Sequence, residues 1–175
     1  RFVQPIPVGE HVRAYEKGRI PTDTARMCSN NGILLSMDLK NFFGNTKLAW
    51  IRNMFMDYGY SRYIASLLAQ MCCCTVVNTR EDGTLSTKRF MPQGTPVSPA
   101  IANRVADQRF DQDVLAMAKK EGWEYYRYSD NIYMTHPDVL SVQKVDNFKR
   151  RVIDTINRAG WRGHKIRVTP KWKRQ

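Results

Sequence analysis

The sequence has few acidic residues and no long apolar run. Sixteen aspartates and glutamates stand against 28 lysines and arginines, which gives a formal net charge of +12 over 175 residues. A chain this basic favours a polyanionic partner, most simply a nucleic acid, although a solvated basic surface is the plainer alternative. No apolar stretch approaches the roughly 18 residues that a membrane-spanning helix needs, so we expect no membrane partner.

Metal-binding cysteine patterns are also missing. The cysteines are Cys28 and the adjacent run Cys72–Cys74, with no Cys-x-x-Cys pair and no histidine at ligand spacing. The segment 71–75 is interpreted as a buried helix end or strand in which cysteine acts as a small apolar residue. We therefore expect an intracellular, reducing compartment, either the cytoplasm or an organelle matrix. His11 and His136 belong to no pattern and are predicted to lie at the surface.

Three short segments carry the chemistry of the chain. Residues 33–39 form a compact apolar run that contains Asp38, which is typical of a buried strand. Residues 91–99 form a loop rich in glycine, proline and serine that opens a long helix ending near residue 120. Residues 123–135 predict a hairpin with Asp130 at its tip. This layout can bring two distant carboxylates to one pair of Mg²⁺ ions, as nucleotidyl transfer requires.

The remaining elements are predicted from helix caps, apolar spacing and turn signals. Gly83 follows an acidic pair and marks the turn of a second hairpin, formed by residues 74–78 and 86–91. The other predictions are one or two helical turns at 10–15, helices at 22–29, 45–57, 61–71 and 137–160, and a basic strand at 165–168.

The three segments together resemble the reverse transcriptase signature, most closely that of bacterial reverse transcriptases of the retron and group II intron kind. The matching motifs are Asp-Leu-Lys-x-Phe-Phe at 38–43, Pro-Gln-Gly-x-Pro-x-Ser-Pro at 92–99 and Tyr-x-Asp-x at 128–131. The resemblance implies an α/β (α+β) polymerase palm, in which helices pack on an antiparallel sheet. It also implies partial fingers and no thumb.

The resemblance divides the chain as well. Residues 1–32 would be a lead-in or part of the fingers, and residues 33–175 the palm, with fingers helices and a hairpin inserted at about 45–92. The activity it implies is RNA-directed DNA polymerase, a nucleotidyltransferase reaction that uses two Mg²⁺ or Mn²⁺ ions. Asp38 and Asp130 would bridge both metals, and the Leu39 carbonyl would complete one of them. Without the resemblance, a turn-capping aspartate and a hairpin-turn aspartate are the simpler readings.

Further site residues follow from the same resemblance. The ring of Phe43 would exclude a ribose 2′-hydroxyl, while Phe42 is the better core residue. Gln93 would bind the template or nucleotide, and Gly94 would let the backbone approach a base pair. Lys165 would protonate the leaving pyrophosphate, with the neighbouring His164 as a competitor for that role; a basic residue on RNA or solvent is the alternative.

Two departures from the family pattern keep other functions open. Asn131 stands where a second aspartate is usual, and the segments that grip a primer–template are missing at both ends. Either the protein is longer or other chains supply the thumb and fingers. One alternative function is a catalytically degenerate RNA-binding scaffold in a ribonucleoprotein. The other is an RNA-directed RNA polymerase, against which Phe43 and the pair Gln93–Gly94 argue.

The expected partners are nucleic acids and nucleotides. We expect an RNA template or structured RNA, an RNA–DNA hybrid, and deoxynucleoside triphosphates. Basic residues crowd the C-terminal part of the chain, where they can present one positive face to a phosphate backbone. The residues predicted to bind nucleic acid are Arg158, Arg162, Lys165, Arg167, Lys171 and Lys173.

Overall fold

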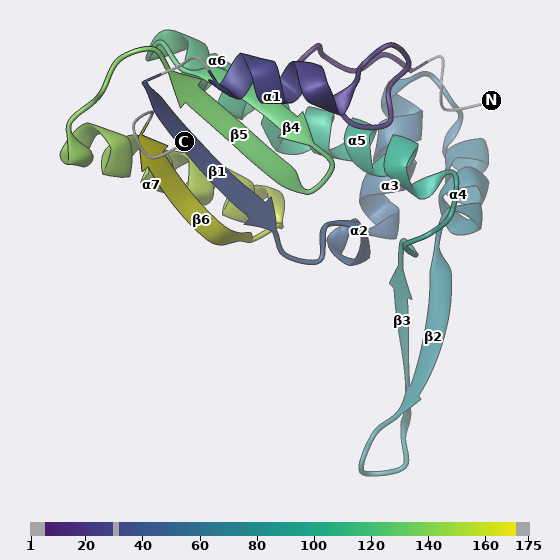
Figure 1. Cartoon of the computed structure of the whole chain (residues 1–175). Coiled ribbons are helices and arrows are strands. Elements are labelled where there is room, and N and C mark those ends of the chain that lie inside the picture. Colours follow the sequence, from purple (N-terminus) through teal and green to yellow (C-terminus); the bar gives the residue numbers. More distant parts are fainter. Residues whose placement is uncertain (1–5, 30–31, 171–175) are drawn as a thin grey trace. The chain divides into compact units, whose positions relative to one another are not determined.

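The structure is a computed structural model that describes residues 6–29 and 32–170, and the chain forms two compact units. The sheet unit comprises Val8–Lys40 and Ala106 onward, and the hairpin unit comprises Asn41–Val105 with the residues that precede Val8. Both units are drawn in Figure 1.

The sheet unit is built on four antiparallel strands in the order β4-β5-β1-β6 (Figure 1). The strands are β1 (Ile33–Leu39), β4 (Glu124–Tyr128), β5 (Asn131–His136) and β6 (Gly163–Pro170). Strand β1 lies in the centre, where alternate side chains are buried on one face and half-exposed on the other. Cross-strand partners share a face of a sheet, so this register decides which side chains accompany Asp38.

Helices cover the sheet unevenly. The elements are α1 (Pro21–Ser29), the π-helix η1 (Asp107–Asp111), α6 (Gln112–Lys120) and α7 (Val142–Ala159). Helix α7 runs along one face of the sheet, and α1 lies over the other face near β5 (Figure 1). Trp123 stacks on Phe148 of α7 with ring centroids 4.6 Å apart. The half-exposed face of β1 is therefore left open toward β6.

The hairpin unit combines short helices with an exposed β-hairpin. Its elements are α2 (Phe42–Asn45), α3 (Leu48–Asp57), α4 (Arg62–Met71), β2 (Cys74–Thr79), β3 (Leu85–Phe90) and α5 (Ser98–Ala106), whose last residue belongs to the sheet unit. Buried Ile51 and Phe55 of α3 form a core with buried Ala65 and Ala69 of α4. The strands β2 and β3 extend well beyond the helices of this unit (Figure 1).

Most predicted elements are confirmed. The strand at 33–39, both hairpins and the basic strand are present, and the Ser61 side chain caps α4 by accepting a hydrogen bond from the Ile64 amide. The long helix reaches Lys120 as predicted, but η1 interrupts it between α5 and α6. Helix α7 begins at Val142, later than predicted, because Ser141 rather than an earlier residue caps its first turn.

Four predictions about local structure and burial are wrong. Residues 10–15 are not helical, because Val12 instead pairs with Arg127 as an isolated parallel bridge. Segment 71–75 is not buried, and Met71 is 83% exposed, because α4 packs through its alanines instead. His11 and His136 are buried rather than at the surface: His11 lies beside two aspartates, and His136 lies against Trp123.

None of the helices within residues 6–29 and 32–170 is both long enough and apolar enough to cross a bilayer.

Candidate active site

The two predicted carboxylates meet at one end of the sheet. Asp38 is the penultimate residue of β1, and Asp130 lies in the turn between β4 and β5. In the register of β1 and β5, Asp38 is directly opposite Asn131, the residue after Asp130. The Leu39 amide donates a hydrogen bond of 2.8 Å to the Asp130 carbonyl oxygen, which ties the turn to the end of β1.

The charges of this pair are incompletely compensated. Burial raises the pKa of Asp130 above its usual value, and the nearby Asp38 carboxylate raises it further. Hydrogen bonds to the Asp130 carboxylate oppose this rise, including one of 3.0 Å from the Asn131 side-chain amide. Two half-buried carboxylates that repel each other are a favourable setting for a hard divalent cation, which supplies the missing positive charge.

A β-bulge in β6 decides which basic side chains face the carboxylates. Asp38 is paired with His164 and Ser36 with Arg167, so the strand carries one extra residue over this stretch. Lys165 lies in the bulge with a left-handed backbone, φ 47°. Without the bulge, His164 and Arg167 would point to opposite faces; with it, both side chains lie on the open face that carries Asp38.

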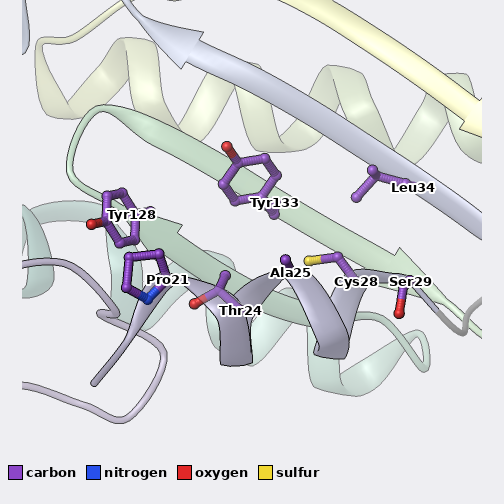
Figure 2. Close-up of a pocket in the computed structure, with 8 residues that line it drawn as sticks. All are labelled: Pro21, Thr24, Ala25, Cys28, Ser29, Leu34, Tyr128 and Tyr133. Carbon is purple, nitrogen blue, oxygen red and sulfur yellow. The ribbon is translucent and has the colours of Figure 1, made fainter. Parts of the chain in front are cut away.

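An apolar pocket of about 500 Å³ lies on the same open face, beneath α1. Figure 2 shows Tyr128 and Tyr133 of the hairpin and Leu34 of β1 opposite Cys28 and other α1 residues. Burial raises the pKa of Tyr133, with smaller contributions from Cys28 and Asp130. Tyr133 is paired with Ser36, two residues before Asp38 in β1, so the pocket offers aromatic surface on the face of the sheet that carries Asp38.

The predicted nucleotide-binding residues lie in the hairpin unit. Phe42 is buried, as predicted, whereas Phe43 is half-buried and meets the Phe42 ring edge-on at 5.4 Å. Gln93 is exposed. Gly94 has φ +85°, and no atom lies within 4 Å of the position that a β-carbon would take. That open, left-handed position suits a close approach of a ligand to the backbone.

The predicted basic surface is only partly available. On α7, Lys149 pairs with Asp146 and Arg151 pairs with Glu121, so these charges are partly compensated within the unit. Arg158 donates a hydrogen bond of 3.1 Å to the Thr155 hydroxyl. The exposed basic residues of β6 and the loop before it are Arg162, Lys165 and Arg167. Lys171 and Lys173 lie outside the described residues.

The sequence analysis missed a buried polar cluster behind the hairpin. Its members are His11, Asp107, Asp111, Tyr125 and Arg127. Asp107 and Asp111 are the first and last residues of η1, and the His11 Nε2 atom lies 2.8 Å from an Asp107 carboxylate oxygen. Ligand atoms of the histidine and the two aspartates lie within 4.8 Å of one another, which is close enough to hold a divalent ion. The signal in the sequence that could have indicated this cluster is the pair Asp107 and Asp111, two aspartates four residues apart on a predicted buried helix.

Comparisons with known proteins identify relatives that match most of this chain. The family described as "Reverse transcriptase (RNA-dependent DNA polymerase)" matches residues 4–167. The retron Mx65 reverse transcriptase of Myxococcus xanthus is 28% identical over 157 residues, covering 87% of this chain and 36% of the relative. The retron Ec86 reverse transcriptase of Escherichia coli is 27% identical over 139 residues, covering 79% of this chain and 39% of the relative.

A solved structure shows the same fold. The telomerase of Candida albicans, in complex with a TWJ fragment of telomeric RNA, superposes with a TM-score of 0.64 at 9% sequence identity. The superposition covers all of this chain and 33% of the telomerase chain. This chain therefore spans between a third and two fifths of the length of these relatives.

Proposed function

Because this chain belongs to the reverse transcriptase family, we propose that it contains the catalytic centre of an RNA-directed DNA polymerase. Members of the family use divalent metal ions for nucleotidyl transfer. The observation that carries the proposal is the convergence of Asp38 and Asp130, which are far apart in sequence, at one end of the sheet. The sheet unit would be the palm, and the helices and hairpin within 45–92 would be part of the fingers.

The carboxylates and the open sheet face suggest how the residues act. Asp38 and Asp130 would hold two Mg²⁺ or Mn²⁺ ions, with the Leu39 carbonyl as a further oxygen ligand. Bound metals would neutralise charge on the reacting phosphates and activate the 3′-hydroxyl of the primer. The protein contributes position and charge, and the half-buried, mutually repelling carboxylates fit that task. Lys165, in the bulge, would donate a proton to the leaving pyrophosphate.

Nucleotide selection would depend on the hairpin unit. The half-buried ring of Phe43 would exclude a ribose 2′-hydroxyl and so favour deoxynucleoside triphosphates. Gln93 would hydrogen-bond the template or the nucleotide, and Gly94 would allow a base pair close to the backbone. The aromatic pocket formed by Tyr128 and Tyr133 offers further apolar surface to nucleotides next to the carboxylates.

The direct experiment is extension of a primer on an RNA template by the complete protein. We expect Mg²⁺-dependent incorporation of deoxynucleotides and little incorporation of ribonucleotides. Efficient ribonucleotide incorporation would instead indicate an RNA-directed RNA polymerase. RNA binding without extension of either kind would indicate a catalytically degenerate scaffold.

Asn131 provides a specific test of the metal site. We expect Asn131→Asp to preserve extension or raise it up to about tenfold at limiting Mg²⁺, because a third carboxylate strengthens binding of a divalent cation. The measurement is the Mg²⁺ concentration that gives half-maximal extension, which should fall. Asn131→Ala is the matched control, since it removes the hydrogen bond to Asp130 without adding charge. A higher Mg²⁺ requirement in Asn131→Asp would contradict a metal site at this turn.

The exposed basic residues of β6 and the loop before it should bind the phosphate backbone of RNA or an RNA–DNA hybrid. We expect the triple change of Arg162, Lys165 and Arg167 to glutamine to weaken RNA binding. The slope of the logarithm of the RNA-binding constant against the logarithm of the salt concentration should become shallower by roughly 2 to 3. Each lost phosphate contact removes about 0.7 to 0.9 from the magnitude of that slope. The loss should be similar for RNAs of different sequence, because phosphate contacts position the ligand without reading bases.

A charge-matched triple variant serves as the control for this measurement. Lys119, Lys120 and Lys144 are exposed basic residues on α6 and α7 of the same unit. Their change to glutamine removes the same charge at a different place. If both triple variants alter the salt slope equally, the effect reflects net charge alone, and a binding surface along β6 is refuted.

A further inference from the structure

The buried cluster behind the hairpin is arranged around one arginine. Arg127 is the fourth residue of β4 and is fully buried, as is its partner Asp111 in η1. The Arg127 Nε atom donates hydrogen bonds of 3.0 and 2.8 Å to the two Asp111 carboxylate oxygens, and Nη2 lies 2.7 Å from one of them. A two-pronged contact of this kind fixes the plane of the guanidinium as well as its position.

The third nitrogen of the same guanidinium reaches the turn between β4 and β5 that carries Asp130. Arg127 Nη1 donates a hydrogen bond of 3.0 Å to the backbone carbonyl of Ser129. Ser129 is buried and has a left-handed backbone with φ 58°, a conformation that most non-glycine residues avoid. The next residue is Asp130, whose own carbonyl accepts the Leu39 amide. The turn thus has an anchor on each side of Asp130, one from β1 and one from Arg127.

Other members of the cluster hold Asp111 and strand β4 in place. The Tyr125 hydroxyl donates a hydrogen bond of 2.5 Å to Asp111, and the Arg127 amide donates one of 2.8 Å to the His11 carbonyl. Burial would raise the pKa of the Asp111 carboxyl, yet the adjacent Arg127 charge, the hydrogen bonds from Arg127 and the nearby His11 lower it. The Asp111 carboxylate therefore stays charged as the partner of Arg127.

The same cluster is a weaker fit to a metal ion. His11, Asp107 and Asp111 offer three ligand atoms, but Arg127 and Tyr125 already occupy both oxygens of Asp111. Burial would lower the pKa of His11, but the adjacent Asp107 and Asp111 carboxylates raise it, so a protonated His11 and Arg127 can balance the two carboxylates. A divalent ion bound by His11 would displace the histidine proton and leave one uncompensated positive charge beside a buried guanidinium.

We propose that Arg127 is a positioning residue for catalysis: held by Asp111, its guanidinium fixes the Ser129 carbonyl and thereby places the Asp130 carboxylate near that of Asp38. This inference rests on the proposed function for its catalytic consequence, whereas the placement of the turn is independent of activity. The side chain acts from behind the sheet through the backbone, and it contacts neither a metal nor the nucleic acid.

The test is Arg127→Lys in the complete protein, with two readouts. Lysine keeps the positive charge but cannot bind Asp111 with two nitrogens and still reach Ser129. We expect hydrogen exchange of the Leu39 amide, which is bonded to the Asp130 carbonyl, to accelerate at least about tenfold. The Mg²⁺ concentration for half-maximal extension should rise at least about threefold, because the two carboxylates no longer hold one geometry.

Two further variants separate positioning from general destabilisation. Arg109→Lys changes another arginine, which lies within η1 and donates a hydrogen bond of 3.1 Å to the Ala159 carbonyl, away from the turn. It should leave exchange at Leu39 and the Mg²⁺ requirement unchanged. Asp111→Asn releases the guanidinium from the opposite side and should reproduce both effects of Arg127→Lys. Exchange at Val152 in α7 reports global opening in every variant.

The outcomes are distinct. Faster exchange at Leu39 in Arg127→Lys and Asp111→Asn, with Val152 unchanged, supports the proposal. Unchanged exchange at Leu39, or an equal rise at Leu39 and Val152, overturns it. Bound metal that copurifies with the wild-type protein and disappears in His11→Gln overturns the proposed arrangement in favour of a metal cluster. If the wild-type protein fails to extend a primer, the proposed function fails, while the exchange readout still decides the role of Arg127.

Discussion

Replacing Asp38 or Asp130 with alanine is expected to lower Mg²⁺-dependent DNA synthesis at least about a thousandfold. Each substitution removes a carboxylate from the end of the sheet where the two side chains converge. A bound divalent ion contributes several kcal/mol to stabilising the transition state of phosphoryl transfer, and each 1.36 kcal/mol corresponds to a factor of ten in rate. If both carboxylates hold both ions, as proposed, loss of either one would weaken the binding of both ions at once. Single-turnover extension with a preformed primer–template measures the effect.

The control for this prediction is Asp154→Ala. Asp154 is an exposed aspartate on α7, in the same unit as the two carboxylates. Its loss changes the net charge by the same amount and should leave the rate within about twofold. Thermal unfolding of Asp38→Ala and Asp130→Ala should occur at or above the wild-type temperature in the absence of metal, because repulsion between the two carboxylates is relieved. Full extension by Asp38→Ala would refute the catalytic assignment.

Phe43→Ala is expected to relax discrimination against ribonucleotides by roughly tenfold to 200-fold. That range is the usual energetic reach of a steric contact of about one methylene in a binding pocket. Phe43 is half-buried against Phe42, so the ring is held in place but is not wholly part of the core. The measurement is the ratio of kcat/KM for a ribonucleotide to that for the matching deoxynucleotide.

Phe42→Leu is the comparison for that experiment. Phe42 is buried, so its change should lower thermal stability while leaving the nucleotide ratio unaltered. Phe43→Ala should change the nucleotide ratio while leaving thermal stability nearly unaltered. If neither substitution changes the ratio, Phe43 is a packing residue and sugar selection lies elsewhere.

The sequence predicted the fold well where local signals and tertiary demands agree. The apolar run containing Asp38 became the central strand β1, and the turn signal at Gly83 marked the β2–β3 hairpin. Apolar spacing failed on α4, where Ile64 and Met71 are exposed and two alanines form the buried stripe. Small residues permit close helix packing, but their apolar signal is weak beside that of leucine or isoleucine.

Only the part of the candidate site that lies in the sequence motifs could be predicted. Asp38 and Asp130 could be named because a strand end and a hairpin tip are recognisable from the sequence and because both lie in motifs that resemble those of a known family. The role proposed for Arg127 could not be anticipated, because its partner Asp111 is 16 residues away on a separate element. The π-helical turn that contains Asp111 also leaves no clear sequence signature. Side-chain networks of this kind depend on tertiary geometry, which local spacing does not encode.

The bulge at Lys165 also determines how β6 tolerates changes in length. Removing one residue between His164 and Arg167 would restore ordinary two-residue alternation along the strand. His164 and Arg167 would then be two residues apart and would both still lie on the face of Asp38. A deletion elsewhere in β6 has no bulge to absorb it and would turn the side chains beyond it to the other face. In β6, therefore, the bulge marks the place where the strand can lose a residue without changing which side chains accompany Asp38.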